Sequence, residues 1–226
     1  PNPIGGEAVE GNVLEPAVRS FVGLYPIPMR HGMTAGEFAL FFNEQAGFGC
    51  KLDIVRCEGW RRAEYFEQTG LPWVLPSPNM PTNDTAVVYP GTVIFEGTNV
   101  SEGRGTTRPF ELIGAPWVDA FKLAAEMQEL GLPGVHFRPA HFEPTFHKGK
   151  GEICGGVQIH VLDRAAFKPY FTAVALLAAI RAQDVEKFGW KQPPYEYEFE
   201  KLPIDLIFGS PSVREGIEAG ADLAAM

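Results

Sequence analysis

Residues 89–117 read YPGTVIFEGTNVSEGRGTTRPFELIGAPW, and this stretch is expected to organise the rest of the chain. It opens with Thr92 to Phe95, a run of β-branched and aromatic residues that predicts a strand. The polar loop that follows, residues 96–108, holds three glycines, two carboxylates and two guanidinium groups. A flexible linker would favour glycine and serine without the arginines. A rigid polar loop after a buried strand is a common place for a binding site; a plain surface turn is the alternative.

The composition is that of an ordinary globular protein, and it narrows the classes of partner. The 226 residues are enough for one large domain or two small ones, and 45% of them are hydrophobic. A formal net charge of −9 argues against nucleic acid or an anionic membrane surface as a partner. No apolar run approaches the roughly 20 residues that a membrane span requires.

Cysteine usage gives no sign of a disulfide framework or a zinc ribbon. The three cysteines are Cys50, Cys57 and Cys154, an odd number without a CxxC pair. We therefore expect buried free thiols.

The clearest helix start lies at Thr34. Thr34 and Glu37 have the spacing of a capping box, in which each side chain bonds the backbone amide of the other residue. Phe38, Phe41 and Phe42 then fall at helical spacing on one face. The pattern predicts a helix that ends at the glycines after residue 46.

Apolar periodicity places the remaining elements. It predicts helices over residues 117–130 and 165–188 and from residue 212, and strands over residues 52–55, 135–139, 155–162 and 195–199. Asp163 is expected to cap the second of these helices. Four prolines between residues 72 and 81 predict an extended path. This segment is either an interdomain linker or a wall that presents Trp73 and Asn79 to a cleft.

Metal and nucleophilic chemistry have little support in the sequence. No HxH or HxxxH pair occurs, and His141, Glu143 and His147 form at most a weak metal site, with packing or surface histidines as the default. There is no GxSxG motif, no P-loop and no GxGxxG motif.

Carboxylate chemistry fits the polar loop better. Glu96, Glu102 and Glu111 lie in or beside it, and glycoside hydrolysis normally uses two carboxyl groups. Arginine can bind a carboxylate in a two-pronged way, and Trp73 could stack on a sugar ring. For each glutamate taken alone, a solvated or arginine-paired surface residue is the alternative.

The order of several motifs resembles the NamZ-type exo-β-N-acetylmuramidases, glycoside hydrolase family 171. They are PNPIGG at 1–6, RHGMT at 30–34, GLPW at 70–73, PSPNMPT at 76–82, EGTN at 96–99 and SEGRGTTRPFE at 101–111. The likeness runs from residue 1 to at least Trp117. It continues more loosely through residues 156–163 and 204–214.

The resemblance implies a bacterial enzyme that removes N-acetylmuramic acid from the non-reducing end of peptidoglycan fragments, outside the cytoplasm and without a cofactor. It implies an α/β fold, with residues 1–70 as the C-terminal part of a Rossmann-like domain. Residues 71–226 would form a smaller α/β (α+β) domain with the pocket-lining loop. The family also has a preceding stretch with a Pro-Glu-His-Gly motif, expected to supply a catalytic glutamate, that this chain lacks. That portion is a candidate partner, besides the sugar substrate.

The resemblance and the side-chain chemistry together give a set of expected site residues. The predicted substrate-binding residues are Arg30, His31, Trp73, Asn79, Asn99, Ser101, Glu102, Arg104, Thr107 and Arg108, and the catalytic role stays open among Glu102, Glu96 and His31. Arg104 or Arg108 is expected to pair with the lactyl carboxylate of muramic acid. No metal is expected. The alternative function is a non-catalytic peptidoglycan- or carbohydrate-binding module without a placed acid.

Overall fold

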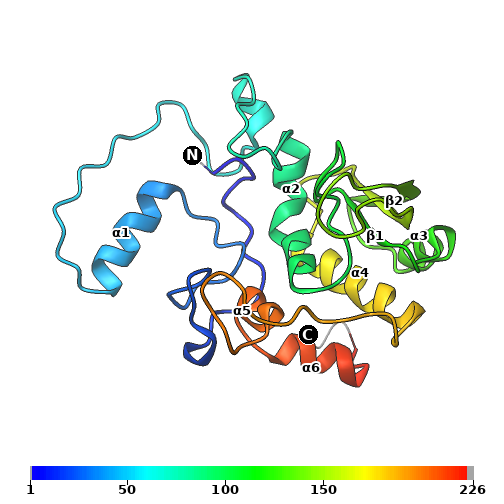
Figure 1. Cartoon of the computed structure of the whole chain (residues 1–226). Helices are drawn as coiled ribbons and strands as arrows, with labels where there is room; N and C mark the ends of the chain where they lie inside the picture. Colours follow the sequence, from blue (N-terminus) through cyan, green and yellow to red (C-terminus); the bar gives the residue numbers. More distant parts are fainter. Residues whose placement is uncertain (1, 223–226) are drawn as a thin grey trace.

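The computed structural model of the protein describes residues 2–222 as helices around one small sheet (Figure 1). The three strands are antiparallel in the order β1-β3-β2: β1 (Leu112–Ala115), β2 (Val135–Phe142) and β3 (Cys154–Val161). The helices are α1 (Ala35–Gln45), α2 (Asn83–Thr92), α3 (Ala120–Glu129), α4 (Pro169–Gln183), α5 (Pro203–Phe208) and α6 (Ser212–Ala219). Short 3₁₀ helices span Pro16–Val18, Phe66–Thr69 and Val93–Gly97. This mixture confirms the predicted α/β class.

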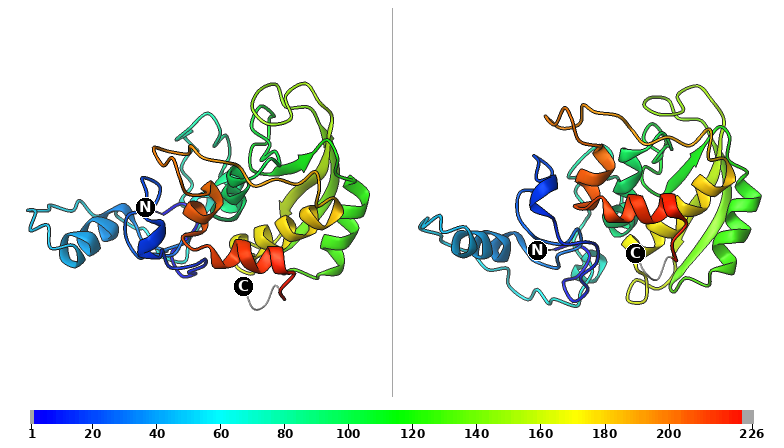
Figure 2. Two further views of the ribbon diagram at one scale, coloured as in Figure 1. Left: turned by 60° about the horizontal axis from the view of Figure 1, so that its bottom comes forward. Right: turned by 90° about the horizontal axis from the view of Figure 1, so that it is seen from below.

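The core lies between the sheet and helices α2, α3 and α4. Phe137 and Ile159 on the sheet are buried together with Leu123 and Met127 of α3. Figure 2 shows α6 beside α4, where the Arg181 guanidinium donates to the Ile217 carbonyl oxygen. In both figures α1 lies apart from the sheet. No helix within residues 2–222 is long and apolar enough to cross a bilayer.

Several predicted elements are confirmed. The strands predicted over residues 135–139 and 155–162 are β2 and β3, and the helix predicted over 117–130 is α3. The Asp119 carboxylate caps α3 by accepting from two backbone amides at 3.0 Å. Helix α6 begins at residue 212 as predicted and buries Val213 and Ile217.

The strand predicted at Thr92 to Phe95 is wrong, because these residues are helical. Helix α2 starts at a cap in which the Thr82 hydroxyl accepts from the Thr85 amide, and a 3₁₀ helix continues it to Gly97. Ile94 and Phe95 are fully buried there. Burial on all sides satisfies β-branched and aromatic residues in either conformation, and a short apolar run does not by itself distinguish a strand from a helix.

Two other predicted strands are also wrong. Residues 52–55 form no regular element. Residues 195–199 form a tight turn, in which Tyr195 and Glu198 exchange backbone hydrogen bonds at 2.8 and 2.9 Å and Tyr197 has a φ of +68°. Tyr197 and Phe199 are mostly exposed, so the aromatic alternation does not mark a half-buried face.

The long helix predicted over residues 165–188 is shorter. Proline at the first helical position sets the start of α4 at Pro169, and the helix ends at Gln183. The Asp163 carboxylate instead closes a separate turn by accepting from the amides of Ala165 and Ala166. Its predicted role as the cap of this helix is therefore wrong.

The N-terminal segment, residues 2–70, carries few regular elements. Phe21 and Phe48 are more than half exposed in it, and Cys50 and Cys57 are exposed, contrary to the expected buried thiols. Both cysteines lie in irregular backbone without packing from the core. Cys154 on β3 is buried as expected, and burial raises its pKa to about 11. The domain boundary near residue 70 stays a prediction.

The capping box of α1 is confirmed. The Thr34 hydroxyl accepts from the Glu37 amide at 3.2 Å, and the Glu37 carboxylate accepts from the Thr34 amide at 2.9 Å. The His31 ring packs against Phe38 on this helix, with centroids 5.3 Å apart. The cap therefore links the helix start to a predicted site residue.

Thr34→Ala is expected to destabilise α1 by about 1 kcal/mol, because an orphan amide loses its acceptor. Hydrogen exchange of the first amides of α1 should become about fivefold faster. Thr34→Ser, which keeps the hydroxyl, is the control and should exchange like the wild type. Unchanged exchange in the alanine variant would show that the cap does not hold the helix.

Glycines let backbone segments touch where β1 meets β3, and we call Gly114, Gly155 and Gly156 the glycine corner. A Cβ added at any of them would lie 2.0–2.2 Å from a backbone carbonyl oxygen. On its other side Gly114 exchanges two backbone hydrogen bonds with Ser101, at 2.8 and 3.1 Å. The polar loop therefore rests directly on this corner.

Candidate functional site

A cavity of about 850 Å³ lies between the N-terminal segment and the helices of the core. Its lining is mostly apolar and includes Phe21, Met29, Phe38, Phe42 and Phe208. Its polar lining residues include His31, Tyr89, Glu96 and Tyr195. Among the described residues that line it, Glu96 is the only carboxylate.

A second cavity, of about 540 Å³, adjoins the first. Arg30, His31 and Trp73 line it, together with part of the proline-rich segment. His31, Phe38 and Tyr89 line both cavities, so they form a shared wall. The structure therefore gathers four of the predicted residues, His31, Glu96, Arg30 and Trp73, around two neighbouring hollows.

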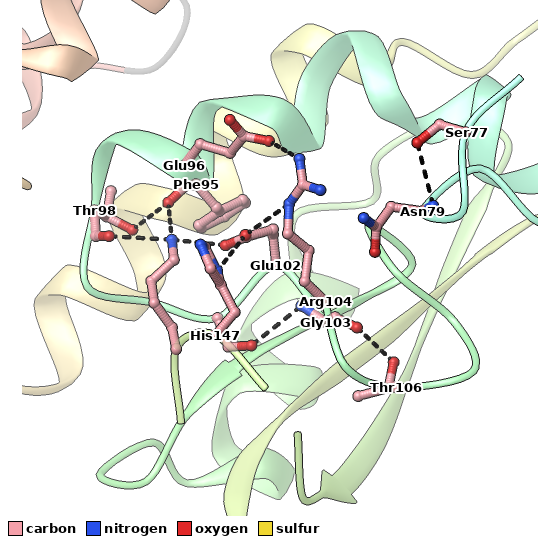
Figure 3. A network of polar contacts seen from close by, with 12 residues as sticks. Ser77, Asn79, Phe95, Glu96, Thr98, Glu102, Gly103, Arg104, Thr106 and His147 are labelled. Carbon is pink, nitrogen blue, oxygen red and sulfur yellow. Dashed lines mark hydrogen bonds and ion pairs between the residues drawn. The ribbon is translucent and has the colours of Figure 1, made fainter. Parts of the chain in front are cut away.

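Glu96 is held from two sides, and Figure 3 shows the contact with Arg104. The Arg104 guanidinium donates to one carboxylate oxygen, and the Tyr195 hydroxyl donates to the other at 3.0 Å. Burial first, and then the charge of Glu96, raises the pKa of Tyr195. The phenol therefore stays protonated and donates its hydrogen to Glu96.

Arg104 joins Glu96 to Glu102. Its Nε lies 3.2 Å from a Glu102 oxygen, and its guanidinium stacks 4.9 Å from the centre of the Phe110 ring. Burial acts to lower the pKa of Arg104, but the hydrogen bond and charges of Glu96 and Glu102 raise it overall. Most of the hydrogen-bonding capacity of the Arg104 guanidinium is thus used by partners inside the protein.

Glu102 is fully buried and is surrounded by basic side chains. Lys148 Nζ lies 2.6 Å and His147 Nδ1 3.2 Å from its oxygens, in addition to Arg104 (Figure 3). Lys148 also donates to the carbonyl oxygens of Phe95 and Thr98, at 2.7 and 3.1 Å. Burial lowers the pKa of Lys148, and the Glu102 charge opposes that shift. This carboxylate braces the polar loop and does not face either cavity.

Two other predicted residues also have internal partners. Asn99 donates to the Lys187 carbonyl oxygen at 2.7 Å and accepts from the Gly189 amide at 3.0 Å. Arg30 is buried and pairs with Glu10 at 2.5 Å.

The remaining predicted residues are less constrained or serve the loop itself. The Ser101 hydroxyl accepts from the Gly103 amide at 3.2 Å, and Thr107 is exposed. The Trp73 indole donates to a backbone carbonyl at 3.1 Å. Asn79 lies in the proline-rich segment, where its backbone amide donates to the Ser77 hydroxyl at 3.3 Å (Figure 3). Arg108 keeps 43% of its side chain exposed, with one Glu111 oxygen 3.5 Å away. Of the two guanidinium groups in the polar loop, that of Arg108 has fewer partners inside the protein than that of Arg104.

Sequence reasoning did not identify Tyr89, Tyr195 or Lys148. Tyr195 falls in the strand predicted over residues 195–199, and its contact with Glu96 spans 99 positions of sequence. Lys148 follows His147, whose φ of +68° bends the backbone beside Glu102. No short-range signal points to either contact.

The weak metal site considered as a possibility at His141, Glu143 and His147 has no support in the described residues. Within the part of the chain that the structure describes, no group of three or more metal-ligating side chains comes together. His141 packs against the Phe121 ring, with centroids 6.2 Å apart, and His147 faces Glu102.

Comparison with known proteins gives a consistent family. A family model described as exo-beta-N-acetylmuramidase NamZ, C-terminal, matches residues 87–226, and the corresponding N-terminal model matches residues 1–84. The chain is 46% identical, over 99% of its length, to the peptidoglycan beta-N-acetylmuramidase NamZ of Bacillus subtilis (strain 168). It covers 52% of that protein, so it spans about half the length of this curated relative.

Two crystal structures from Bacteroides fragilis NCTC 9343 share the fold. The DUF1343 family protein BF0371 has a TM-score of 0.86 and 36% sequence identity, over 96% of this chain and 57% of that chain. The DUF1343 family protein BF0379 has a TM-score of 0.69 and 24% identity, over 100% of this chain and 58% of that chain, which supports the fold alone.

Proposed function

This chain belongs to the NamZ exo-β-N-acetylmuramidase family, and on that premise we propose that it forms part of a glycoside hydrolase that releases terminal N-acetylmuramic acid from peptidoglycan fragments. The observation that carries the proposal is the near-complete alignment of the chain with the B. subtilis muramidase. A non-catalytic binding module is the weaker interpretation, because that relative is an enzyme. A peptidoglycan substrate also favours an extracytoplasmic location, which stays a prediction.

Glu96 is the carboxylate best placed to meet a sugar in this chain. A glycosidase needs one carboxylate that is ionised, as base or nucleophile, and one carboxyl group that is protonated. Arg104 and Tyr195 both donate to the carboxylate oxygens of Glu96 and fix its position in the cavity wall, so we assign Glu96 the role of base or nucleophile. The protonated partner is not assigned to a residue of this chain.

His31 offers a neutral donor in the wall of the same cavity as Glu96. Burial lowers the pKa of His31, so the imidazole is neutral at pH 7. Its Nδ1 accepts from the Met33 amide at 3.1 Å, which leaves the proton on Nε2. Because His31 lines both cavities, this N–H can donate to a hydroxyl or acetamido oxygen of the sugar.

The proposed function is tested with two chromogenic glycosides. We expect release of nitrophenol from a β-N-acetylmuramide and much slower release from the matching β-N-acetylglucosaminide. The assay uses this chain and, in parallel, the B. subtilis relative, because the chain spans about half of that protein. Equal rates on the two glycosides, or no activity in either protein, would refute the assignment.

Arg108→Ala is expected to weaken binding of N-acetylmuramic acid on the order of tenfold, with little change for N-acetylglucosamine. Only muramic acid has the lactyl carboxylate, and Arg108 is the loop arginine with free binding capacity. Calorimetric titration of both sugars measures the difference. Arg104→Ala should instead weaken both sugars alike, because its partners are Glu96 and Glu102.

Arg61→Ala is the control for Arg108, since Arg61 also pairs with a glutamate three residues away but is 80% exposed and lies outside the polar loop. Equal losses for the two sugars in Arg108→Ala would mean that this arginine holds the loop through Glu111. No loss for either sugar would place the lactyl group elsewhere.

A further inference from the structure

One face of the sheet carries polar side chains that the proposed hydrolysis does not use. The register places His136 opposite His160 and Arg138 opposite Gln158. Residues two apart on a strand point to the same side, so these four side chains form one block, which we call the open sheet face. His136 and Arg138 are exposed, and Gln158 and His160 are partly exposed.

The other parts of the sheet are covered. Helix α3 packs against the opposite face, where Phe137 and Ile159 are buried. The far end of the same face is closed by the loop over residues 143–153, where a Cβ at Gly149 would lie 2.6 Å from Cys154 Sγ. The open sheet face is thus a bounded patch on a rigid support.

The groups on this patch have unused hydrogen-bonding capacity. The Arg138 guanidinium donates to Gln158 Oε1 at 2.5 Å, which orients its planar fork across the two strands. Within residues 2–222 no carboxylate forms an ion pair with Arg138, and the buried Nε2 of His160 has no hydrogen-bond partner.

The patch is cationic in a protein of net charge −9. The charges of Glu111 and Arg108 both act on His160, and the opposing effect of Glu111 is the larger of these two. The nearby carboxylate of Glu111 is turned inward, where the Thr85 hydroxyl donates to it at 2.9 Å. An arginine fork without a carboxylate, beside imidazole and amide groups, matches the geometry of a carboxylate ligand.

We propose that the open sheet face binds a carboxylate of the acidic peptides that substitute peptidoglycan, and so holds the protein on the polymer. The proposal rests on the proposed function for its choice of ligand, because that substrate polymer carries peptide carboxylates. His136, Arg138, Gln158 and His160 line neither cavity, and none of them has a role in the proposed hydrolysis. The interaction is electrostatic and is weakened by salt.

The experiment measures sedimentation of this chain with insoluble peptidoglycan from which phosphate-containing polymers have been removed. Arg138→Ala should reduce the affinity on the order of tenfold, through loss of a charge-assisted pair. Gln158→Glu should do the same, because its carboxylate would occupy the Arg138 fork internally. Arg61→Ala, which removes an exposed arginine elsewhere, should bind like the wild type.

A second arm identifies the ligand. Peptidoglycan whose peptides have been removed by an amidase should bind the wild type as weakly as intact material binds Arg138→Ala. Equal binding to both materials, unchanged binding by the Arg138 variant, or a requirement for the phosphate polymers would each overturn the proposal. Circular dichroism spectra matching the wild type confirm that the variants are folded.

Failure of this proposal is distinct from failure of the proposed function. Arg138→Ala should hydrolyse the soluble muramide at the wild-type rate, in this chain or at the aligned position of the B. subtilis relative. Absence of hydrolysis in the wild type would refute the enzyme assignment and leave the sedimentation result standing. Normal hydrolysis with no peptide-dependent sedimentation would refute only the docking surface.

Discussion

Replacing Glu102 with glutamine is expected to lower the free energy of unfolding by about 3–5 kcal/mol. Glu102 is fully buried, and Lys148 Nζ lies 2.6 Å from its carboxylate. Glutamine keeps the shape of the side chain but removes its charge. The mostly buried ammonium and the Arg104 guanidinium then lose a shared counter-charge in surroundings of low dielectric constant. Urea denaturation at pH 7 measures the loss.

A double-mutant cycle measures the interaction energy between Glu102 and Lys148 separately from their contacts with other residues. Lys148→Met alone should also destabilise the protein, whereas Glu102→Gln with Lys148→Met should cost clearly less than the sum of the two. Glu152 is an exposed glutamate in the loop over residues 143–153, which also carries Lys148. Glu152→Gln is therefore the matched control and should change the free energy of unfolding by less than about 0.5 kcal/mol. Additive losses would show that Glu102 and Lys148 do not act as a buried pair.

Glu96→Gln is expected to reduce turnover of the chromogenic muramide by a factor on the order of 10²–10⁴, as loss of a positioned catalytic carboxylate typically does. The amide is similar in size and still accepts a hydrogen bond from Tyr195, but it cannot act as base or nucleophile. The initial rate under saturating substrate measures the effect. Binding of the sugar should change much less than the rate.

Glu111→Gln is the matched control, because Glu111 is buried beside the same loop and lines neither cavity. Its hydroxyl partner, Thr85, can still hydrogen-bond the amide. A large rate loss in this variant and none in Glu96→Gln would exchange the roles of the two residues. Equal small losses would indicate that neither carboxylate acts on the substrate.

The sequence predicted correctly those elements that are determined by residues close together in the chain. The capping box of Thr34 and Glu37, the apolar periodicity of α3 and the alternation along β3 need only neighbouring residues, and the structure confirms these elements. The apolar run at Thr92 to Phe95 is different, since its conformation depends on burial against distant segments. Its helical state could not be read from residue type.

The polar loop was correctly identified as a dense polar cluster, but the sequence does not show which side chains turn inward. Glu102 and Glu96 are both glutamates six residues apart, yet one is fully buried and the other lines a cavity. The difference comes from Lys148 and Tyr195, which lie 46 and 99 positions away from their partners in the chain. Such pairings follow from the folded topology.

The glycine corner limits how this sequence can vary over evolution or in an engineered library. Alanine is ordinarily the mildest replacement for glycine, but at Gly114, Gly155 and Gly156 even its single methyl group would overlap a backbone carbonyl. A survey of all single substitutions, scored by the amount of folded protein, should therefore find these sites intolerant of every residue type. Because Ser101 hydrogen-bonds to Gly114, the same intolerance should extend to sugar binding. The sheet can acquire new side chains only at the end away from this corner, where the open sheet face lies.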